Sequence, residues 1–597
     1  MNTHTSDTST PLSVKAIAFE NDFAFDVEES HLTDDNGLTI SRYAFDFGKS
    51  VVPEPILLEW EVPLVDIAGK WHPEINSDRS LTAGWTKYLH SYATLNAPVM
   101  NLFSGRGENR HCFALSDAVN PLKLQAQMNE ETATVRCRVI LFDAPTPEMA
   151  SYEITLRRDE RKIGYQQALS DVAQWWADME AYHPENVPAS ALEPVYSTWY
   201  SYHQELSPEV IEAECRWARD LGCGTVILDD GWQTDDENKG YAFCGDWEIA
   251  ISKFPDFAGH VKRIQEMGMK YMLWYSVPYA GLKSETWKRF QNRVLAKPFS
   301  NAACLDPRYR EVRAYLISCY ERAVKEWGVD GLKLDFVDQF TAELPGSDVD
   351  ETADMLSVPA AADRLLTDVM GSLKQISPDI LIEFRQKYIG PAMRKYGNLF
   401  RAQDCPNDAL SNRVRTLDVR LLAGTTAVHS DMIMWHPEES PEQVAHQLWA
   451  TLFSVPQISV RKSVITADQE KTLRFYLGFW TEHRDLLLHG KLTPHYPQDL
   501  YPVVSAQHGK DALWVGYADR VMRIDEASLS CERLMLVNGG HESRLVVEFA
   551  SEVEMKEMNI FDCQGNEVES ESVSSVTVKG IHALSIPVSG VAICRLK

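Results

Sequence analysis

The sequence predicts an α/β protein built around a central (β/α)8 TIM barrel, with a β-sandwich before the barrel and a small antiparallel β-sandwich after it. From about residue 194, short apolar segments alternate with longer amphipathic segments over about 300 residues, which is typical of a parallel barrel. On both sides the chain changes to short segments in which apolar and polar residues alternate, as in antiparallel strands. We therefore expect three domains: 1–185, 186–488 and 489–597.

Eight segments of the central region have the length and apolar character of barrel strands. In order they are PVYSTWYS, TVILDDGW, KYMLWYS, DGLKLDF, DILIEFR, NLFRAQD, TTAVHSD and PQISV. Helix signals lie between them: after the first strand, Ser207 is a suitable N-cap, Pro208 fits the first helical position and Gly222 fits the C-terminal end. A doubly wound open sheet is the competing fold, but no GxGxxG turn follows the first strand.

The composition excludes several classes of partner. The chain has 597 residues and a net charge of −28, without a cluster of Lys or Arg, which argues against binding to nucleic acid or to an anionic membrane surface. No apolar run is long enough to span a bilayer, and the first residues lack the apolar core of a secretory signal. The 11 cysteines are scattered, without a CxxC pair, so we expect reduced thiols and a cytoplasmic location.

Charged and aromatic residues gather at the C-terminal ends of the predicted barrel strands, where barrel active sites lie. Asp229 and Asp230 end the second strand, Lys333 and Asp335 the fourth, and Asp404 the sixth. Other strand ends carry further candidates for substrate binding: Trp199, Trp274, Arg385, His429 and Asp431. A single Asp at a strand end is often only a cap for the following helix, but carboxylates at several ends indicate a common site.

Two carboxylates facing a polyhydroxylated substrate are typical of glycoside hydrolysis. One carboxylate attacks the anomeric carbon, while the other protonates the leaving oxygen and then activates water. Lys333 lies two residues before Asp335 and therefore points to the same side of the strand, where its charge can keep a carboxylate ionised. The pair Asp229 and Asp230 suits hydrogen bonds to neighbouring sugar hydroxyls. Asp230-Gly231 also fits a simple turn, which is the structural alternative.

We expect neither a cofactor nor a metal ion. His429 and Asp431 have no second His at ligand spacing, and the chain contains no GxSxG nucleophile turn. The tryptophans at the strand ends have two interpretations, because each can pack in the core or line a sugar site.

The sequence around these strands also resembles that of a known family. VILDDGWQ, CGDWEIAISKFPDFAGHVKRIQEMGMKYMLWYS and GVDGLKLDF resemble the α-galactosidases of glycoside hydrolase family 36, in clan D. The shared features are Asp-Asp-Gly-Trp at a strand end, Gly-Asp-Trp in a loop, Lys-Phe-Pro, Gly-Met before strand three and Lys-x-Asp on strand four. The resemblance is strong from Pro194 to about Asp408, and the three-domain layout fits the same family.

The resemblance implies a retaining mechanism through a covalent glycosyl-enzyme. It places the nucleophile on Asp335 and the general acid/base on Asp404, with Asp408 as the alternative. It assigns sugar contacts to the Asp229–Asp230 pair and to Lys333, and one further contact to Trp247 of the Gly-Asp-Trp loop. The expected partner is an oligosaccharide or other glycoside, and the family is often homo-oligomeric. For the mechanism, we expect a carboxyl separation of about 5–5.5 Å, a raised pKa for Asp404 and a low pKa for Asp335.

The chain differs from the family in the segment that lines the sugar pocket. The Cys-x-Ser-Gly-Gly-Gly-Arg segment expected after strand five is replaced by IEFRQKYIGPAMRKYG, with Arg385, Gln386 and Lys387 in its place. The glycon therefore stays open, and the two cations raise the alternative of an anionic sugar. Two other functions also stay open: a transglycosylase of the same mechanism and a catalytically inactive sugar-binding barrel.

Overall fold

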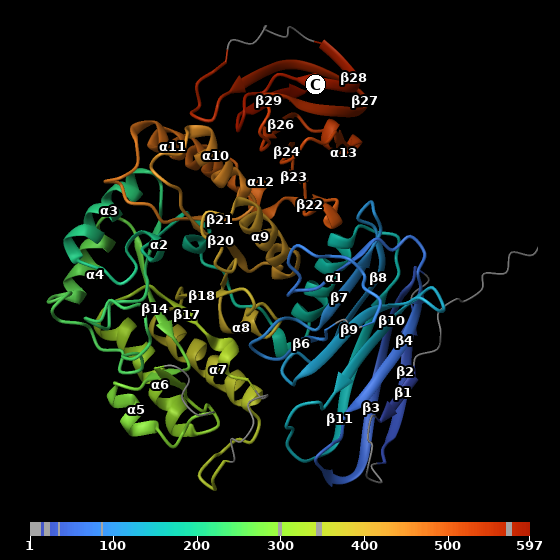
Figure 1. The fold of residues 1–597 in the computed structure, drawn as a ribbon, viewed down its shortest axis with the longest axis vertical. Helices are drawn as coiled ribbons and strands as arrows, with labels where there is room; N and C mark the ends of the chain where they lie inside the picture. Colours follow the sequence, from blue (N-terminus) through green and yellow to red (C-terminus); the bar gives the residue numbers. More distant parts are fainter. Residues whose placement is uncertain are drawn as a thin grey trace, which may run out of the picture.

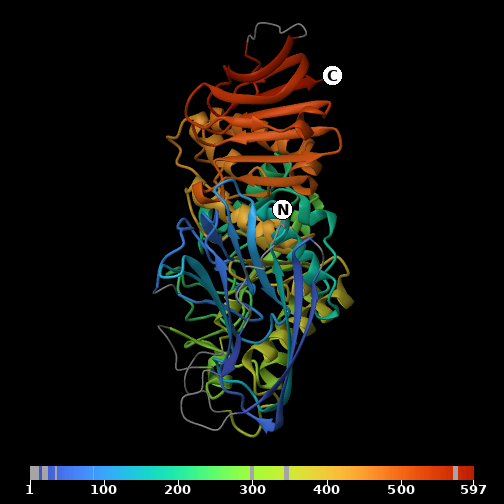
Figure 2. The same cartoon turned by 90° about the vertical axis from the view of Figure 1, so that its right-hand side faces the viewer.

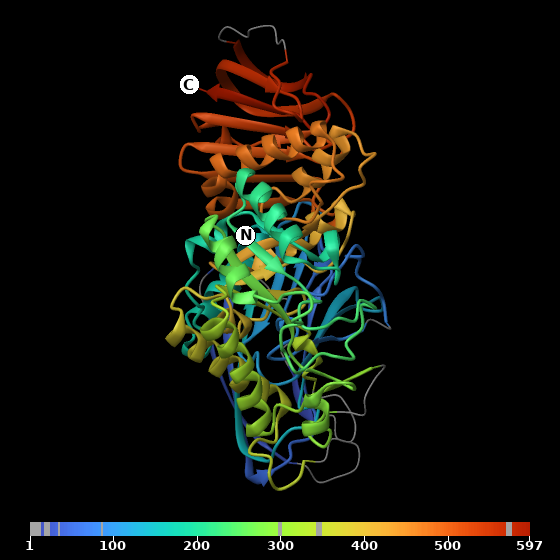
Figure 3. The ribbon, with the colours of Figure 1, turned by 90° about the vertical axis from the view of Figure 1, so that its left-hand side faces the viewer.

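The computed structural model has three parts that follow one another along the chain, as Figure 1 shows: an N-terminal β domain, a central barrel and a C-terminal β domain. In Figure 1 the C-terminal sheet lies above the barrel and the N-terminal domain lies beside it; Figures 2 and 3 show the same stacking from the two sides. The structure describes residues 13–16, 24–33, 36–84, 87–295, 301–341, 349–568 and 576–596.

The central domain is a closed parallel barrel, which confirms the predicted fold class. All eight predicted strands form, and they pair in chain order around the barrel. They are β12 (Val195–Ser197), β13 (Thr225–Leu228), β14 (Lys270–Ser276), β17 (Gly331–Asp335), β18 (Leu381–Arg385), β19 (Leu399–Arg401), β20 (Ala427–Ile433) and β21 (Val455–Ile458). Each strand is nearly all buried, as expected for strands covered by helices on the outside and packed side chains within.

Helices connect the barrel strands, and their ends follow the predicted signals. They are α2 (Trp199–Tyr202), α3 (Pro208–Asp220), α4 (Phe257–Glu266), α5 (Glu285–Phe290), α6 (Arg310–Glu326), α7 (Val358–Ile376), α8 (Met393–Tyr396), α9 (Ala409–Ala423), α10 (Pro441–Ala450), α11 (Ala467–Glu482) and α12 (Arg484–His489). Helix α3 begins as expected: the Ser207 hydroxyl accepts a hydrogen bond from the Val210 N–H. Gly222 follows α3 with φ +102°, the left-handed conformation that glycine adopts most easily. A short antiparallel pair, β15 (Tyr279–Gly281) and β16 (Ala302–Cys304), extends the connection between β14 and β17.

The N-terminal domain consists of two antiparallel sheets around their own apolar core. One sheet has the order β1-β4-β10-β9-β6 and the other β2-β3-β11-β8-β7-β5. Their strands are β1 (Ser13–Ala16), β2 (Asp26–Thr33), β3 (Leu38–Val51), β4 (Ile56–Pro63), β5 (Gly69–Trp71), β6 (Leu89–Ser91), β7 (Val99–Phe103), β8 (Asn109–Leu115), β9 (Leu122–Asn129), β10 (Thr134–Leu141) and β11 (Met149–Asp159). Tyr43, Trp60 and Phe113, from both sheets, are fully buried in one cluster, and helix α1 (Tyr165–Ala177) leads on toward the barrel.

The C-terminal strands are joined by hydrogen bonds in one continuous sheet. Among the described residues its order is β22-β23-β24-β26-β29-β27-β25, with β28 paired to β27. Most pairs are antiparallel, but β24–β26 and β25–β27 are parallel. The strands are β22 (Lys491–His495), β23 (Val503–His508), β24 (Asp511–Gly516), β25 (Met522–Ile524), β26 (Arg533–Asn538), β27 (Leu545–Phe561), β28 (Val576–Leu584) and β29 (Val591–Leu596).

The three parts meet at one buried carboxylate, that of Asp418 on α9. Arg79 of the N-terminal domain donates through Nη2 to Asp418 Oδ2 at 2.9 Å, and Trp71 Nε1 donates to Asp418 Oδ1 at 2.8 Å. Tyr501 of the C-terminal part donates its hydroxyl to the same Oδ1 at 2.6 Å. The Arg79 and Asp418 side chains are each 1% exposed, so this ion pair is buried between all three parts.

Among the described residues, no helix combines the length and the apolarity that a membrane span requires.

Candidate active site

The C-terminal ends of β13, β17, β18 and β19 bring the predicted carboxylates and their cations together. Lys333 Nζ contacts Asp229 Oδ2 at 2.5 Å across the barrel, and Arg385 Nε contacts Asp335 Oδ1 at 2.6 Å. The charges of Asp335, Lys333 and Arg385 in turn act on Asp404. Strand ends that are far apart in the sequence thus form one charged site.

Asp335 ends β17 and accepts hydrogen bonds from several directions. Its Oδ1 accepts from Arg385 Nε, from the Tyr388 hydroxyl at 3.1 Å and from the Phe336 N–H at 2.8 Å, and its Oδ2 accepts from Trp274 Nε1 at 3.3 Å. The residue is 8% exposed. Burial alone would raise the pKa of Asp335, but the charges of Arg385 and Lys333 and these hydrogen bonds hold it well below its usual range. Asp335 is therefore an ionised carboxylate with a fixed orientation.

The neighbouring pair at the end of β13 is held differently. Asp229 is neutralised by Lys333, whereas Asp230 accepts hydrogen bonds from two amides, Gln204 Nε2 at 2.8 Å and Gln233 Nε2 at 2.6 Å. Burial and the charge of Asp229 together raise the pKa of Asp230 to about 6, although the hydrogen bonds from Gln233 and Gln204 lower it. Two neutral amides thus hold the Asp230 carboxylate, in contrast to the ion pair of Asp229.

Asp404 follows β19 and is the most accessible of these carboxylates, with 43% of its side chain exposed. Its Oδ1 accepts from Arg401 Nη2 at 2.8 Å, and its backbone carbonyl accepts from Arg415 Nη1 at 2.6 Å. Burial would raise the pKa of Asp404, but Arg401, Lys333 and Arg385 lower it in this structure. This direction differs from the raised pKa expected from the sequence, because the charges of Arg401, Lys333 and Arg385 outweigh the effect of burial.

Asp408, the alternative acid/base, is the N-cap of α9. Its Oδ1 accepts from the Ser411 N–H at 2.9 Å and its Oδ2 from the Ser411 hydroxyl at 2.6 Å, and the side chain is exposed. These contacts are those of an ordinary helix cap. Both carboxylate oxygens of Asp408 are thus bound to the first turn of α9.

The three tryptophans that the sequence singled out differ in position. Trp274 contacts Asp335 directly and is 2% exposed. Trp247 is fully buried at 6.1 Å from Trp274, ring centroid to ring centroid, and its Nε1 has no hydrogen-bond partner. Trp199 begins α2 and is partly exposed, with its ring packed edge-on against His203. Trp274 thus lies at the Asp335 carboxylate, and the Trp247 ring packs against Trp274.

His429 and Asp431 lie inside the barrel. His429 is fully buried, with Nε2 at 2.8 Å from the Ala191 carbonyl and Nδ1 at 3.2 Å from Gln457 Nε2. Burial lowers its pKa to about 4, so the imidazole is neutral. Asp431 is also fully buried, and protein groups bond to both of its carboxylate oxygens. The structure does not bring either side chain to an exposed position at the strand ends, where a sugar would meet it.

Several site residues escaped the sequence reasoning. Arg401 lies in the middle of the predicted strand NLFRAQD. A charge within a buried strand needs a partner, so its presence indicates a functional position. Tyr388, Gln204 and Gln233 lie in loops, and no sequence signal distinguishes them from ordinary surface residues. Lys387, named with Arg385 as a possible anion binder, contacts Glu74 Oε1 of the N-terminal domain at 2.8 Å.

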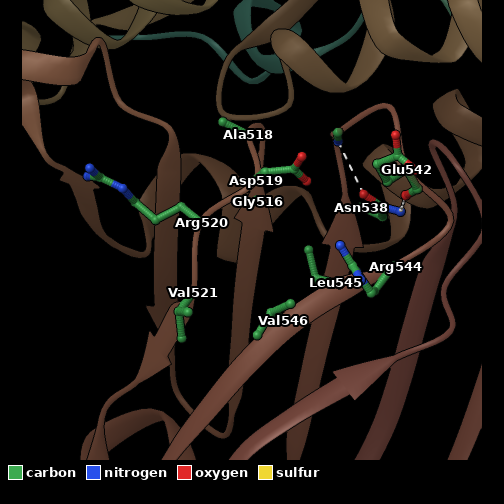
Figure 4. A pocket seen from close by; sticks show the side chains of 11 residues that line it. Gly516, Ala518, Asp519, Arg520, Val521, Asn538, Glu542, Arg544, Leu545 and Val546 are labelled. Atoms are coloured by element: carbon green, nitrogen blue, oxygen red, sulfur yellow. Dashed lines mark hydrogen bonds between the residues drawn. The ribbon is translucent and has the colours of Figure 1, made fainter.

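Other cavities lie away from this charged site, at the C-terminal part and against the outer helices α6 and α7. A cavity of about 200 Å³ lies at the strand ends of the C-terminal sheet (Figure 4), but its charged side chains are exposed: Asp519, Arg520, Glu542 and Arg544. No group of three or more His, Cys, Asp or Glu side chains in the described ranges is arranged to hold a metal ion.

Comparisons with known proteins point to one family. The family described as Melibiase matches residues 166–389. α-Galactosidase Mel36A of Lactobacillus acidophilus is 26% identical over 150 residues, which cover 24% of this chain and 19% of Mel36A. The A type blood α-D-galactosamine galactosaminidase of Flavonifractor plautii is 24% identical over 173 residues. These residues cover 26% of this chain and 15% of the galactosaminidase. The matched segments thus span less than one fifth of these curated relatives.

Solved structures extend the likeness to the whole fold. The galactosidase domain of AgaSK aligns with a TM-score of 0.60 at 12% identity, covering 99% of this chain and 86% of its own. The family 36 α-galactosidase AgaA of Geobacillus stearothermophilus, solved with raffinose, aligns with a TM-score of 0.60 at 14% identity, covering 98% and 87%. The family match, the curated relatives and the shared three-part fold agree with the Asp-Asp-Gly-Trp and Lys-x-Asp motifs. Residues 166–389 of this chain match the melibiase family, and the fold as a whole is similar to that of the family 36 α-galactosidases.

Proposed function

We propose that this protein is a retaining α-glycoside hydrolase of the α-galactosidase type, with Asp335 as nucleophile and Asp404 as general acid/base. The observation that carries the proposal is the environment of Asp335. A buried carboxylate that is ionised, oriented by Arg385, Tyr388 and Trp274, and placed at a barrel strand end is suited to attack an anomeric carbon.

In the first step, Asp335 forms a bond to the anomeric carbon while the bond to the leaving oxygen breaks. Asp404 gives its proton to that oxygen, and the sugar is held as a glycosyl ester of Asp335. In the second step, Asp404 takes a proton from water, which displaces Asp335 and restores the configuration. Asp229, Asp230 and Lys333 offer hydrogen bonds to the sugar hydroxyls.

The low pKa of Asp404 suits the second step, in which Asp404 acts as a base. The first step needs a protonated Asp404, and substrate binding raises its pKa for that step. Asp404 is partly exposed, so a bound glycoside that excludes water raises its pKa by desolvation. The negative charge of Asp335 also raises the pKa of Asp404, and this contribution disappears once Asp335 is esterified. Asp404 therefore changes from acid to base as the reaction proceeds.

For the glycon, we propose a neutral or amine-bearing sugar of galacto configuration. The relatives are named as α-galactosidases and as a galactosamine galactosaminidase, whose substrates share that configuration. An anionic sugar has less support, because Arg385 is paired with Asp335 and Lys387 with Glu74. No observation favours a transglycosylase over a hydrolase. The cytoplasmic location is supported by the 11 free, buried cysteines, and a homo-oligomer stays a proposal.

The experiment is hydrolysis of aryl α-glycosides of galactose, galactosamine, glucose and a uronic acid, with the first-formed anomer read by NMR. We expect galacto-configured substrates to react with retention. Asp335→Asn should lose about 10³-fold or more in kcat/KM, and Asp404→Ala should regain activity with azide on activated substrates only. An inverted product, or near-normal rates in Asp335→Asn, would contradict the mechanism. No turnover of any glycoside by wild-type protein would favour the inactive sugar-binding alternative.

A further inference from the structure

Arg401 lies between three carboxylates beneath the proposed acid/base. Its side chain is 1% exposed. Nη2 contacts Asp404 Oδ1 at 2.8 Å, Nη1 contacts Asp431 Oδ1 at 2.5 Å, and Nε lies 3.6 Å from Glu383 Oε1. The longest of these contacts is not a hydrogen bond, and Nε and Glu383 Oε1 have no hydrogen-bond partner. One guanidinium is thus shared chiefly between the exposed Asp404 and the buried Asp431.

Asp431 is also tied to the backbone of the acid/base loop. Its Oδ2 accepts from the Cys405 N–H at 2.6 Å, and Cys405 directly follows Asp404. The same Oδ2 accepts from the Tyr200 hydroxyl at 2.9 Å. With Oδ1 held by Arg401, both carboxylate oxygens have protein donors, so Asp431 faces the loop and not a sugar.

We propose that Asp431 is a positioning residue for the general acid/base: it anchors the peptide that follows Asp404 and shares the charge of Arg401 with it. The inference rests on the proposed function of Asp404. It replaces the direct sugar contact that the sequence predicted for Asp431. It also assigns a role to a buried carboxylate that takes no direct part in the reaction.

The electrostatic consequence follows from the neighbours of the pair. An Arg401 that served Asp404 alone would hold it ionised, which opposes its role as a proton donor. Burial raises the pKa of Asp431, Arg401 lowers it, and the charge of Asp404 raises it. By reciprocity, an ionised Asp431 raises the pKa of Asp404. The other titratable or charged groups that face the pair are Lys333 and Asp335 of β17, Glu383 and Arg385 of β18, Arg415 of α9, Tyr200 of α2 and Cys405.

The test compares Asp431→Asn with the matched variant Asp408→Asn. Both remove one carboxylate charge near Asp404, but Asp408 is an exposed cap that Asn replaces well. In Asp431→Asn, Arg401 acts on Asp404 undivided, so the alkaline limb of kcat/KM should move about one pH unit lower. The limb of Asp408→Asn should stay in place. Hydrolysis of an unactivated α-glycoside should fall at least about tenfold more than hydrolysis of a dinitrophenyl α-glycoside, which needs no proton.

A second readout does not depend on turnover. Carbodiimide coupling modifies protonated carboxyl groups, and peptide mass spectrometry reads its pH midpoint at Asp404. We expect the midpoint to move lower in Asp431→Asn and to stay at the wild-type value in Asp408→Asn. Equal midpoints in wild type and Asp431→Asn would overturn the inference even in an active enzyme. Equal losses on activated and unactivated substrates would reduce Asp431 to a purely structural residue. Absence of hydrolysis by wild type, with shifted midpoints, would instead overturn the proposed function alone.

Discussion

At the scale of single residues, the chemistry depends on an ionised carboxylate in a place that excludes water. Asp335 is buried at the end of an apolar strand, and an unpaired charge there would be unfavourable by several kcal/mol. Arg385 and Lys333 supply the opposite charge, while Tyr388 and the Phe336 N–H fix the oxygen that Arg385 also contacts. Orientation and ionisation thus come from the same neighbours.

Removal of the Tyr388 hydroxyl should weaken both properties. Tyr388→Phe deletes one hydrogen bond to the charged form of Asp335, which is worth about 1.5–3 kcal/mol, so we expect kcat/KM to fall about 10- to 100-fold. Because that bond lowers the pKa of Asp335, its loss raises the pKa, and the acid limb of kcat/KM should move to higher pH. An unchanged profile with normal rates would mean that the contact does not exist in the working enzyme.

At the scale of elements, the barrel strands were predictable and parts of their lining were not. Runs such as TVIL and LIEF are continuous apolar segments, because a parallel strand is buried on both faces, and the helices between them carry ordinary caps such as Ser207. The charged residues at the strand ends were also predictable, because a residue such as Asp335 stands out at the end of an apolar segment. Arg401 interrupts an apolar segment in the same way, but it lies within the predicted strand, and barrel active sites are expected beyond the strand ends.

Loop residues lie beyond this kind of reasoning. Gln204, Gln233 and Tyr388 reach the site only because their loops close over the strand ends, and that closure depends on contacts distant in sequence. The Asn96 N–H, for example, donates to the Lys387 carbonyl at 2.7 Å, so the N-terminal domain helps to hold the loop that carries Tyr388. Sequence spacing within one loop does not encode such a contact.

At the scale of the whole molecule, the domains are joined through the helix that follows Asp404, the proposed acid/base. Helix α9 begins at Ala409, after the Asp408 cap, and carries Asp418, the carboxylate at which the three parts meet. The N-terminal domain, the barrel and the C-terminal part therefore stabilise the same helix that supports Asp404.

Breaking this junction should destabilise the whole protein. Asp418→Asn leaves Arg79 buried without its counter-ion, which costs about 3–5 kcal/mol, and should lower the thermal midpoint by several degrees. Glu153→Gln is the matched control, since its ion pair with Arg42 is exposed at the surface, where solvent screening leaves such pairs with little effect on stability. Equal midpoints for the two variants would show that the junction does not hold the domains together.

The central claim is a covalent glycosyl-enzyme on Asp335, and mass spectrometry of the trapped intermediate tests it most directly. The protein is incubated with an activated fluoro-glycoside of the sugar that it hydrolyses best, digested, and searched for the labelled peptide. We predict one glycosyl group on the carboxylate of Asp335, and no label in Asp335→Asn. A label on another carboxylate, or steady turnover without any covalent adduct, would contradict the mechanism.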